Sequence, residues 1–457
     1  MSRTRTAEET GEQPKRIPNH WIGVRKERSK LSDVWIDDLI QLPPQQLKTH
    51  ALVIGATGSG KTNFLHHLIA QDILLRQSFV IIDMRGDLVN AALELACEYV
   101  HPHEVALFDL REKQKPLGFN PLFGAGEAYF RALGVLEVIA EESESWGVQL
   151  AETLRNAVML LAESAEPLTK LERIFYDRGF RNSLASRCST ESVRDFWVRY
   201  GQLSDDKQNS LATPVLNKVS LLFATESLRR TLGHQAPLDL GKHLNTPGSI
   251  TLVSLAVDEL HGAGKMMGSL LLSSVCREIF SRIGIPESKR NPVRLYIDEF
   301  EHFGTDIFED ILAEGRRFGL SLVLAHQTLA QLNTRVRSMI LNNVGVKVVF
   351  RSGREDGAVL SKDLTGDAKA FDIATLPVGE AILSRRSEKP FIVQINEPLF
   401  KDVGVRSPEA DLFLSDLSER IPEFEEHTPQ EEETPKPDSD DPKQKKPKKD
   451  GDLGDWL

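Results

Sequence analysis

The stretch that most constrains the fold is ALVIGATGSGKT, which occupies residues 51–62. A short apolar run leads to Gly55, four residues follow, and the stretch ends in Gly60, Lys61 and Thr62. This spacing fits the phosphate-binding loop G-x-x-x-x-G-K-S/T, which follows a strand and opens a helix. The apolar run supplies the strand, and residues 63–74 are predicted to form the helix. The sequence therefore predicts a strand, loop and helix that bind a nucleoside triphosphate.

The residue types of this loop explain how it would hold ATP and Mg²⁺. Glycines let the backbone bend tightly and turn its N–H groups inward, and the helix N-terminus adds partial positive charge beneath the phosphates. The Lys61 ammonium would reach the β- and γ-phosphates, and the Thr62 hydroxyl would hold Mg²⁺. The residues predicted to bind nucleotide are Gly55, Ala56, Thr57, Gly58, Ser59, Gly60, Lys61 and Thr62.

Composition limits the class of protein. The 457 residues are enough for two or three structural units, and no apolar run approaches the roughly 18 residues of a membrane span. Three distant cysteines, Cys97, Cys188 and Cys276, lack a C-x-x-C spacing and indicate neither a disulfide framework nor a zinc site. A cytoplasmic location is expected. The net charge of −11 argues against a surface covered with nucleic-acid contacts, although a ring can keep its basic residues inside a channel.

Two further apolar runs end in carboxylates. Residues 79–83 form one run, after which Asp83 and Asp87 either face the nucleotide or cap the next helix. Residues 293–299 form the other run, which delivers Asp298 and Glu299 together at a strand end. Asp298 is predicted to hold Mg²⁺, and Glu299 is predicted to act as the general base that polarises the attacking water.

A third run, residues 320–325, ends in His326 and Gln327. If this strand lies beside the strand of Asp298, the Gln327 amide can contact the γ-phosphate or the water. His326 is interpreted as a buried polar residue with a partner, and Glu301 and His302 are interpreted as solvated or structural.

The segment between residues 299 and 320 carries two arginines that would have to act on a neighbouring subunit. Residues 307–315 form a helix that runs back from the carboxyl edge of the sheet to its opposite edge. Arg316 and Arg317 then lie far from Lys61 of the same chain. If either arginine acts on a nucleotide, the nucleotide must belong to a neighbouring subunit.

The chain divides into five segments by composition and periodicity. Residues 1–30 are polar and basic and are predicted to be a flexible arm, and residues 31–120 begin the nucleotide-binding core. Residues 121–245 carry helical periodicity without β-alternation and predict an all-helical insert, as a structural lid or as a contact for DNA or a partner. Residues 246–400 complete the core and end in a hairpin. Residues 401–457 form a C-terminal extension that is expected to be disordered from about residue 421, where apolar residues become scarce.

Several motifs in the same order resemble the HerA/FtsK superfamily, and within it most resemble the TraD/TraG-type coupling proteins of conjugation and type IV secretion. The motifs span roughly residues 45–397 and are Gly55–Thr62, Ile82–Leu88, Leu295–Phe300, Ala313–Leu320, Leu324–Gln327, Asn342–Gly345 and Val349–Arg351. The resemblance implies a RecA-like P-loop α/β fold with a mostly parallel sheet and an all-helical insert.

The resemblance also implies roles and partners. The chain is similar to hexameric ATPases that pump DNA, and Lys61, Thr62, Asp298, Glu299 and Gln327 match the catalytic positions of the superfamily. Arg316 matches the arginine finger. Arg351 is a second candidate contact with nucleotide, because it leaves a strand at the edge of the phosphate loop. The role of Arg316 requires a neighbouring subunit, and the resemblance implies a ring of identical subunits, expected to be a hexamer.

Two departures from the superfamily narrow this expectation. The chain lacks the N-terminal transmembrane helices usual in conjugative coupling proteins, and its first 45 residues are too few for the β-barrel of HerA helicases. A coupling-like ATPase without an intrinsic membrane segment is expected, for which recruitment to the membrane would need a partner.

Three functions follow as expectations. The first is an ATP-driven DNA translocase of conjugation or type IV secretion, with a relaxase or a secretion-channel component as its protein partner. The second is a HerA-like DNA motor that works with a nuclease in end processing or in defence against phage. The third is a secretion or assembly ATPase that acts on protein.

The end of the chain adds one hypothesis. Trp456 and Leu457 stand beside Asp450, Asp452 and Asp455 after a stretch that is poor in apolar residues. This tip is either a docking peptide for a separate protein or a solvated acidic tail.

Overall fold

The structure is a computed structural model that describes residues 21–28, 35–42, 44–143, 145–303, 305–386, 388–400 and 406–424. The expected N-terminal arm up to residue 20 lies outside these residues. The C-terminal tail from residue 425, with Trp456 and Leu457, lies outside them as well.

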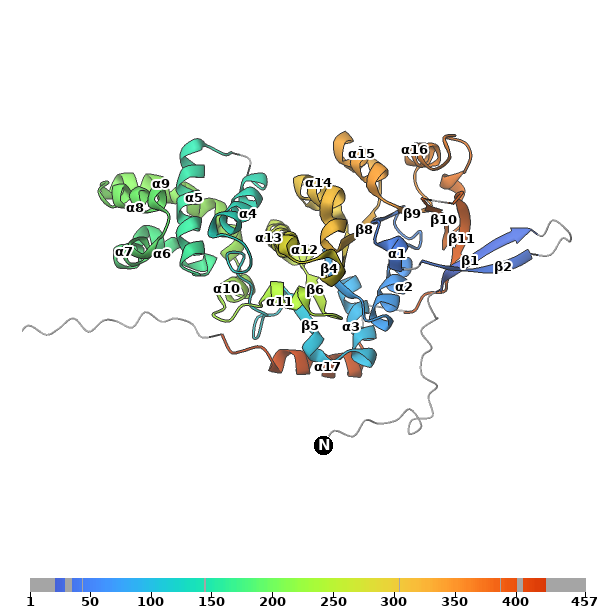
Figure 1. The fold of residues 1–457 in the computed structure, drawn as a ribbon, viewed down its shortest axis with the longest axis horizontal. Helices are drawn as coiled ribbons and strands as arrows, with labels where there is room; N and C mark the ends of the chain where they lie inside the picture. Colours follow the sequence, from blue (N-terminus) through green and yellow to red (C-terminus); the bar gives the residue numbers. More distant parts are fainter. Residues whose placement is uncertain are drawn as a thin grey trace, which may run out of the picture. The chain divides into compact units, whose positions relative to one another are not determined.

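The fold is built on one sheet of 11 strands in the order β2-β1-β11-β10-β9-β3-β8-β7-β4-β6-β5 (Figure 1). The strands from β9 to β5 run parallel, and β10, β11, β1 and β2 continue the sheet antiparallel. The strands are β1 (Trp21–Arg28), β2 (Trp35–Gln41), β3 (Ala51–Ile54), β4 (Ser78–Asp83), β5 (Val105–Asp109), β6 (Ile250–Ser254), β7 (Val293–Asp298), β8 (Leu320–His326), β9 (Val346–Phe350), β10 (Glu380–Arg385) and β11 (Phe391–Ile395). This mostly parallel sheet confirms the predicted fold class.

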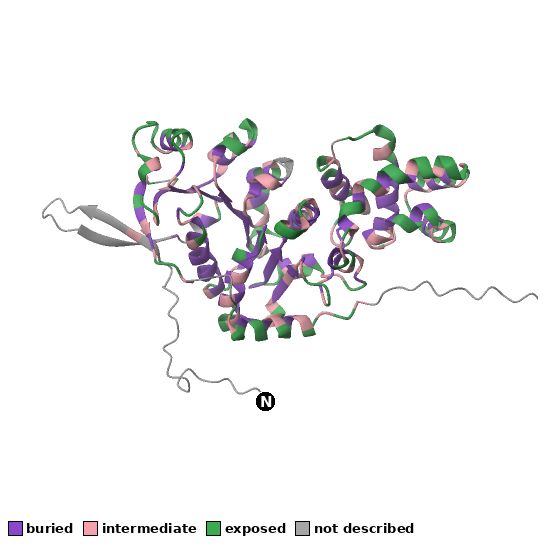
Figure 2. Ribbon diagram, turned by 180° about the vertical axis from the view of Figure 1, so that it is seen from behind, coloured by how far each residue is buried: buried purple, intermediate pink, exposed green. Residues whose placement is uncertain are grey.

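The central strands are buried along their length because helices cover both faces. Every residue of β3, β4 and β8 is buried (Figure 2), which is why their sequences read as continuous apolar runs rather than as alternating patterns. On one face, Val53 packs in a core with α2 (Lys61–Leu74) and α3 (Asp87–Tyr99). On the other, Leu52 and Ile54 pack in a core with α13 (Gly262–Phe280), α14 (Thr305–Glu314) and α15 (Thr334–Asn343).

Between β5 and β6 the described residues form helices and no strand (Figure 1). The helices are α4 (Ala128–Glu141), α5 (Val148–Glu163), α6 (Leu171–Tyr176), α7 (Arg178–Arg187), α8 (Glu191–Gly201), α9 (Asp205–Val219), α10 (Glu226–Gly233) and α11 (Leu240–Asn245). Trp197 and Phe175 pack with ring centroids 5.8 Å apart, and the Trp197 indole donates to the Asn156 carbonyl. This helical insert joins the rest of the structure through α4, which packs along α13.

Four more helices complete the structure: α1 (Pro44–Leu47), α12 (Val257–Leu260), α16 (Arg354–Thr365) and α17 (Pro408–Glu419). Helix α17 lies along α3 and the edge strand β5. The chain then reaches the insert, where the Pro422 carbonyl is 3.1 Å from His234 Nε2. Among the helices that the structure describes, none has the length and apolar composition needed to cross a bilayer.

The N-terminal segment differs from its prediction. We expected residues 1–30 to be a flexible arm, but Trp21–Arg28 is a strand. It pairs with β2 on one side and with β11 on the other. A strand whose backbone groups pair on both sides needs little apolar alternation of its own, so its charged sequence hides it.

Candidate nucleotide site

A cleft of about 560 Å³ at the carboxyl edge of the sheet brings together Lys61, Thr62, Asp298, Glu299 and Gln327 of the predicted site residues. Its lining combines the loop after β3, the turn after β4, the ends of β7 and β8, and the residues before β10. The lining residues are Thr57, Gly58, Gly60, Lys61, Thr62, Asn63, Asp83, Met84, Arg85, Asp87, Leu88, Asp298, Glu299, Gln327 and Val378. Strands β3, β8 and β7 are neighbours in that order, which is why residues separated by more than 200 positions line one cleft.

The phosphate-loop glycines are required by the backbone and by close packing. Gly60 has φ 114° and Gly58 has φ 72°, a region that side chains disfavour. A Cβ on Gly55 would stand 2.5 Å from Phe350 Cβ of β9. The loop is also tied to its surroundings, because the Ala56 N–H donates to the Arg351 carbonyl at 2.7 Å and the Gly379 N–H donates to the Ser59 carbonyl at 3.1 Å.

Lys61 fits an anion at this place. Its ammonium is buried and donates to the Gly55 and Ala56 carbonyls at 2.6 and 3.2 Å. Burial lowers its pKa, and Asp298 and Glu299 oppose that effect. The first N–H groups of α2 lack partners inside the helix and carry the positive end of its dipole. Together these groups suit the phosphates of a nucleotide.

The carboxylates across the cleft are crowded. Burial and then the neighbouring Asp83 and Glu299 carboxylates raise the pKa of Asp298 to about 6, while Lys61 opposes them. A divalent cation held by Asp298 and Thr62 would relieve this repulsion, because carboxylate and hydroxyl oxygens are ligands that Mg²⁺ accepts. The donor set therefore fits Mg²⁺.

Glu299 and Gln327 are in direct contact. The Gln327 amide donates to Glu299 Oε1 at 3.0 Å, and the Thr57 hydroxyl donates to Gln327 Oε1 at 3.1 Å. Glu299 has φ 55° and ψ 46°, a left-handed conformation that is uncommon outside glycine and is often found at functional sites. The strand end thus turns sharply to present the carboxylate.

Asp83 and His326 both have structural roles at the site. The Asp83 carboxylate accepts the Leu88 and Arg85 N–H groups at 2.7 and 3.0 Å, so it caps α3 while it lines the cleft. The completely buried His326 contacts Glu301 through Nδ1 at 2.7 Å. His326 and Glu301 are therefore structural, as we interpreted them.

The two arginines predicted to contact nucleotide lie at opposite edges of the sheet. Arg316 precedes β8 and is near His50, whose pKa falls to about 4 because of burial and then of the Arg316 charge. His50 comes directly before β3, whereas Lys61 comes after it, so Arg316 lies at the amino edge. Arg351 lies at the carboxyl edge, where its carbonyl contacts the phosphate loop. Its side chain is not part of the cleft lining described above.

Three contacts of the site carry no clear signal in the sequence. These are the Thr57 bond to Gln327, the support of the phosphate loop by Gly379, and a 3.8 Å approach of His302 Nε2 to Glu299 Oε2. A glycine just before a strand is the only hint of the second. The others depend on how distant segments meet.

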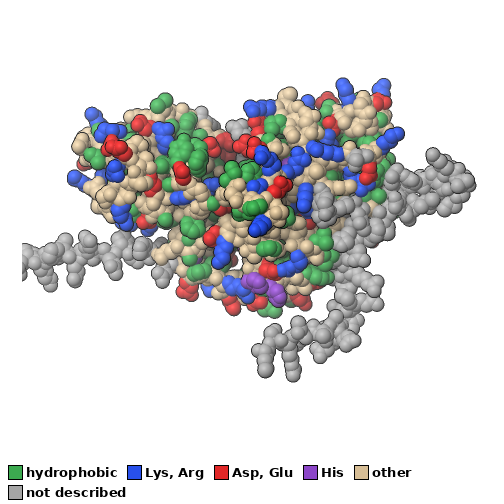
Figure 3. Space-filling model, in the orientation of Figure 1, with side chains coloured by type: hydrophobic (Ala, Val, Ile, Leu, Met, Phe, Trp, Pro, Cys, Tyr) green, Lys and Arg blue, Asp and Glu red, His purple; other side chains and the backbone are tan. Residues whose placement is uncertain are grey.

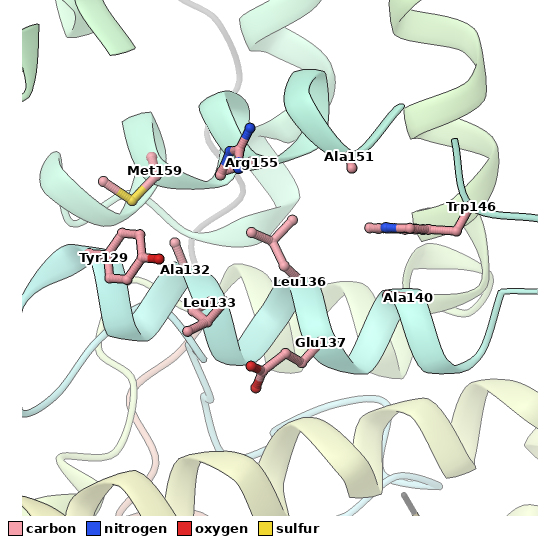
Figure 4. Close-up of a pocket in the computed structure, with 10 residues that line it drawn as sticks. All are labelled: Tyr129, Ala132, Leu133, Leu136, Glu137, Ala140, Trp146, Ala151, Arg155 and Met159. Atoms are coloured by element: carbon pink, nitrogen blue, oxygen red, sulfur yellow. The ribbon is translucent and has the colours of Figure 1, made fainter. Parts of the chain in front are cut away.

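A second pocket, of about 220 Å³, lies between α4 and α5 in the insert (Figure 4). Tyr129, Leu136, Trp146 and Met159 provide most of its lining, and Glu137 and Arg155 are its charged residues. One acid and one base on apolar walls do not form a phosphate site, so the cleft beside Lys61 is the candidate for nucleotide.

Comparisons with known proteins agree with this geometry. The family described as the central domain of helicase HerA matches residues 39–261, and the family described as the TraM recognition site of TraD and TraG matches residues 292–369. The first match contains the phosphate loop, and the second contains Asp298, Glu299, Arg316 and Gln327.

Curated relatives are distant. The chain is 21% identical over 407 residues to the type 4 coupling protein DotL of Legionella pneumophila, which covers 74% of this chain but 50% of DotL. It is 23% identical over 419 residues to the DNA double-strand break repair helicase HerA of Sulfolobus acidocaldarius, which covers 83% of this chain and 72% of that helicase. The chain thus spans only about half the length of DotL.

Solved structures share the fold. The plasmid coupling protein TrwB in complex with the non-hydrolysable ATP analogue ADPNP superposes with a TM-score of 0.57 at 17% identity, covering 81% of this chain and 90% of TrwB. TrwB in complex with ADP and Mg²⁺ gives a TM-score of 0.55. At these identities the match establishes the P-loop fold.

The crowded carboxylates predict a pH-dependent effect of Asp298→Asn on stability without nucleotide or Mg²⁺. The folded pKa of Asp298 is raised from 3.8 to about 6, so the wild-type protein loses stability as pH rises through this range. The variant should be more stable by about 3 kcal/mol at pH 7.5. This advantage should shrink below pH 6 and vanish near pH 4.

Urea unfolding at pH 7.5 and pH 4 measures the difference. Asp310→Asn removes an exposed carboxylate of α14 and is the matched control, which should follow the wild type at both pH values. An equal gain in stability from Asp298→Asn at both pH values would contradict the prediction.

Proposed function

Because this chain is a P-loop ATPase of the HerA/FtsK type that resembles coupling proteins, we propose that it hydrolyses ATP to move DNA through a ring of identical subunits. One observation carries the proposal. Lys61, Thr62, Asp298, Glu299 and Gln327 line a single cleft, although they come from three different segments. This is the arrangement needed to hold a triphosphate on one side and to activate a water molecule on the other.

Each side chain has a distinct task. The Lys61 ammonium would exchange its carbonyl partners for phosphate oxygens, and Thr62 and Asp298 would hold Mg²⁺. When bound, Mg²⁺ neutralises charge on the phosphates. Glu299 would orient the attacking water and accept its proton, and the Gln327 amide would direct Glu299 or the γ-phosphate.

The position of Arg316 supports a ring. Strand β8 separates Arg316 from the cleft, and its seven residues span roughly 20 Å. Arg316 is only half-buried, so it is accessible to a neighbouring subunit, where it would stabilise the charge of the transition state. The number of subunits is proposed to be six. Arg351, at the carboxyl edge, is proposed as a further contact with nucleotide.

The proposed substrate is DNA, and the proposed setting is conjugation or type IV secretion. The relatives support this choice, since one is a type 4 coupling protein and another a DNA repair helicase. Basic and acidic side chains are mixed over the face seen in Figure 3. A relaxase or a channel component would be the partner, and would recruit the motor from the cytoplasm to the membrane.

A second candidate function has its own support. The HerA central domain matches residues 39–261, and the chain covers 72% of a HerA helicase. A DNA motor that works with a nuclease in end processing or phage defence would use the same cleft. A motor acting on protein, by contrast, would not respond to DNA.

ATP hydrolysis with and without DNA separates the two DNA motors from a motor that acts on protein. We expect double- or single-stranded DNA to stimulate hydrolysis, because a translocase couples its cycle to contact with its track. Particle images of the same sample report the ring. Hydrolysis that ignores both forms of DNA would contradict a DNA motor and favour a protein substrate.

Two variants separate binding from hydrolysis. Lys61→Ala should lose ATP binding, because it removes the cation that faces the phosphates. Glu299→Gln should bind ATP normally and lose hydrolysis by about 100-fold or more, because it spares the loop and removes the base. Binding of a fluorescent ATP analogue and phosphate release measure the two steps. Hydrolysis by Glu299→Gln at the wild-type rate would show that Glu299 is not the base.

A mixing experiment tests the action of Arg316 in trans. Arg316→Ala should bind nucleotide but be inactive as a pure ring, because every site lacks its neighbour's charge. Mixing it with Lys61→Ala should restore part of the activity, since some interfaces then pair an intact Lys61 with an intact Arg316. No recovery across a range of ratios, with mixed rings verified by differential tags, would exclude a finger in trans.

A further inference from the structure

The turn that carries Glu299 is anchored to His326 by the next two residues. Phe300 is buried and packs its ring 5.0 Å from that of His326, and Glu301 contacts His326 Nδ1. Phe300–His302 forms one turn of 3₁₀ helix whose last N–H, that of His302, donates to the Glu299 carbonyl at 3.2 Å. The left-handed backbone of Glu299, directly before this turn, leaves its carboxylate on the side of His302, with Oε2 and Nε2 3.8 Å apart.

The two oxygens of the Glu299 carboxylate have different neighbours. Oε1 accepts a hydrogen bond from the Gln327 amide at 3.0 Å. Oε2 is 3.8 Å from His302 Nε2, which is about 1 Å longer than a hydrogen bond. Catalytic contacts are often long without substrate and shorten in the reacting complex. His302 is thus close enough to restrain the oxygen that Gln327 leaves free.

The contact made by the other ring nitrogen of His302, Nδ1, determines which of the two nitrogens carries the hydrogen. Lys265 Nζ lies 3.3 Å from His302 Nδ1. An ammonium can only donate, so Nδ1 must accept. A neutral imidazole with Nδ1 as acceptor carries its hydrogen on Nε2, the atom that faces Glu299. Lys265 therefore selects the tautomer that can donate to the carboxylate.

We propose that His302 is a positioning residue for Glu299, with its neutral Nε2–H tautomer set by Lys265. It directs one carboxylate oxygen while Gln327 directs the other, so that the base presents a fixed lone pair to the attacking water. This inference rests on the proposed role of Glu299 as the base. It assigns a task to a residue that the sequence led us to treat as solvated or structural.

The same contact connects the base to the helical insert. Lys265 lies in the first turn of α13, along which α4 packs. Partial burial raises the pKa of Glu142, the residue after α4, and the Lys265 charge opposes that rise.

Steady-state kinetics with variants of His302 tests the proposal. His302→Ala should lower kcat by about tenfold or more, a part of what a general base contributes, with the Kd for a fluorescent ATP analogue unchanged. His302→Gln should recover most of kcat, because its amide nitrogen can donate to Glu299 while its oxygen accepts from Lys265. His103→Ala changes an exposed histidine at the opposite edge of the sheet and is the matched control.

The tautomer gives a readout that a purely structural role would not affect. The ¹⁵N signals of the His302 ring are assigned by their absence from the spectrum of His302→Gln. In the wild type, their chemical shifts should report the Nε2–H form. Lys265→Met should give a mixture of the two tautomers and a lower kcat. Lys265→Arg should keep the wild-type tautomer and a kcat near that of the wild type. An Nδ1–H tautomer in the wild type, or equal kcat in His302→Ala, would overturn the proposal.

Glu299→Gln in the same assay separates the two levels of inference. If Glu299→Gln is inactive while His302→Ala is fully active, His302 has no positioning role and the base assignment stands. If Glu299→Gln hydrolyses ATP normally, the base assignment fails and the role of His302 fails with it. DNA is left out of all these measurements, so they do not depend on translocation.

Discussion

The parallel register of β3, β8 and β7 is the constraint on which the rest of this structure depends. Ile54 pairs with His326, and Asp298 pairs with Ala325, so three strands end at the same level. The phosphate loop, Gln327 and Glu299 each come directly after the last residue of one of these strands. Because parallel strands share their direction, everything that follows a strand end must meet at one edge. The cleft is a consequence of strand order, and the loops supply its chemistry.

The charges that line this cleft explain why it is suited to binding a ligand. Asp83, Asp298 and Glu299 face a single ammonium, that of Lys61, which itself is satisfied by two backbone carbonyls. Burial of several carboxylates beside one cation costs stability, and the left-handed backbone at Glu299 adds strain. Both are expected where a site is organised for a partner that brings compensating charge. A triphosphate with its divalent cation brings phosphates for Lys61 and a cation for Asp298.

In the proposed ring, the two edges of the sheet would have different tasks in neighbouring subunits. Nucleotide chemistry belongs to the carboxyl edge, and Arg316 lies at the amino edge with His50, whose pKa is lowered by burial and by the Arg316 charge. A rigid sheet keeps these edges a strand's length apart, so an isolated subunit cannot bring Arg316 to its own cleft. The contacts from Glu299 through His302 to Lys265 run in another direction, toward α13 and the helical insert.

The sequence by itself determined the local chemistry. The phosphate loop follows from glycine spacing, the placement of Asp298 and Glu299 follows from an apolar run that ends in two carboxylates, and the fold follows from alternating buried strands and helices. Tertiary structure alone decided which side chains touch. The Thr57 contact joins distant segments through space, and the His302 contact depends on the left-handed backbone at Glu299. Asp83 became a helix cap, and Trp21–Arg28 became a strand because it pairs with β2 and, at Gly23 and Val24, with β11. Hydrogen bonds between distant segments depend on strand order and on angstrom-scale packing, which the spacing of residue types does not encode.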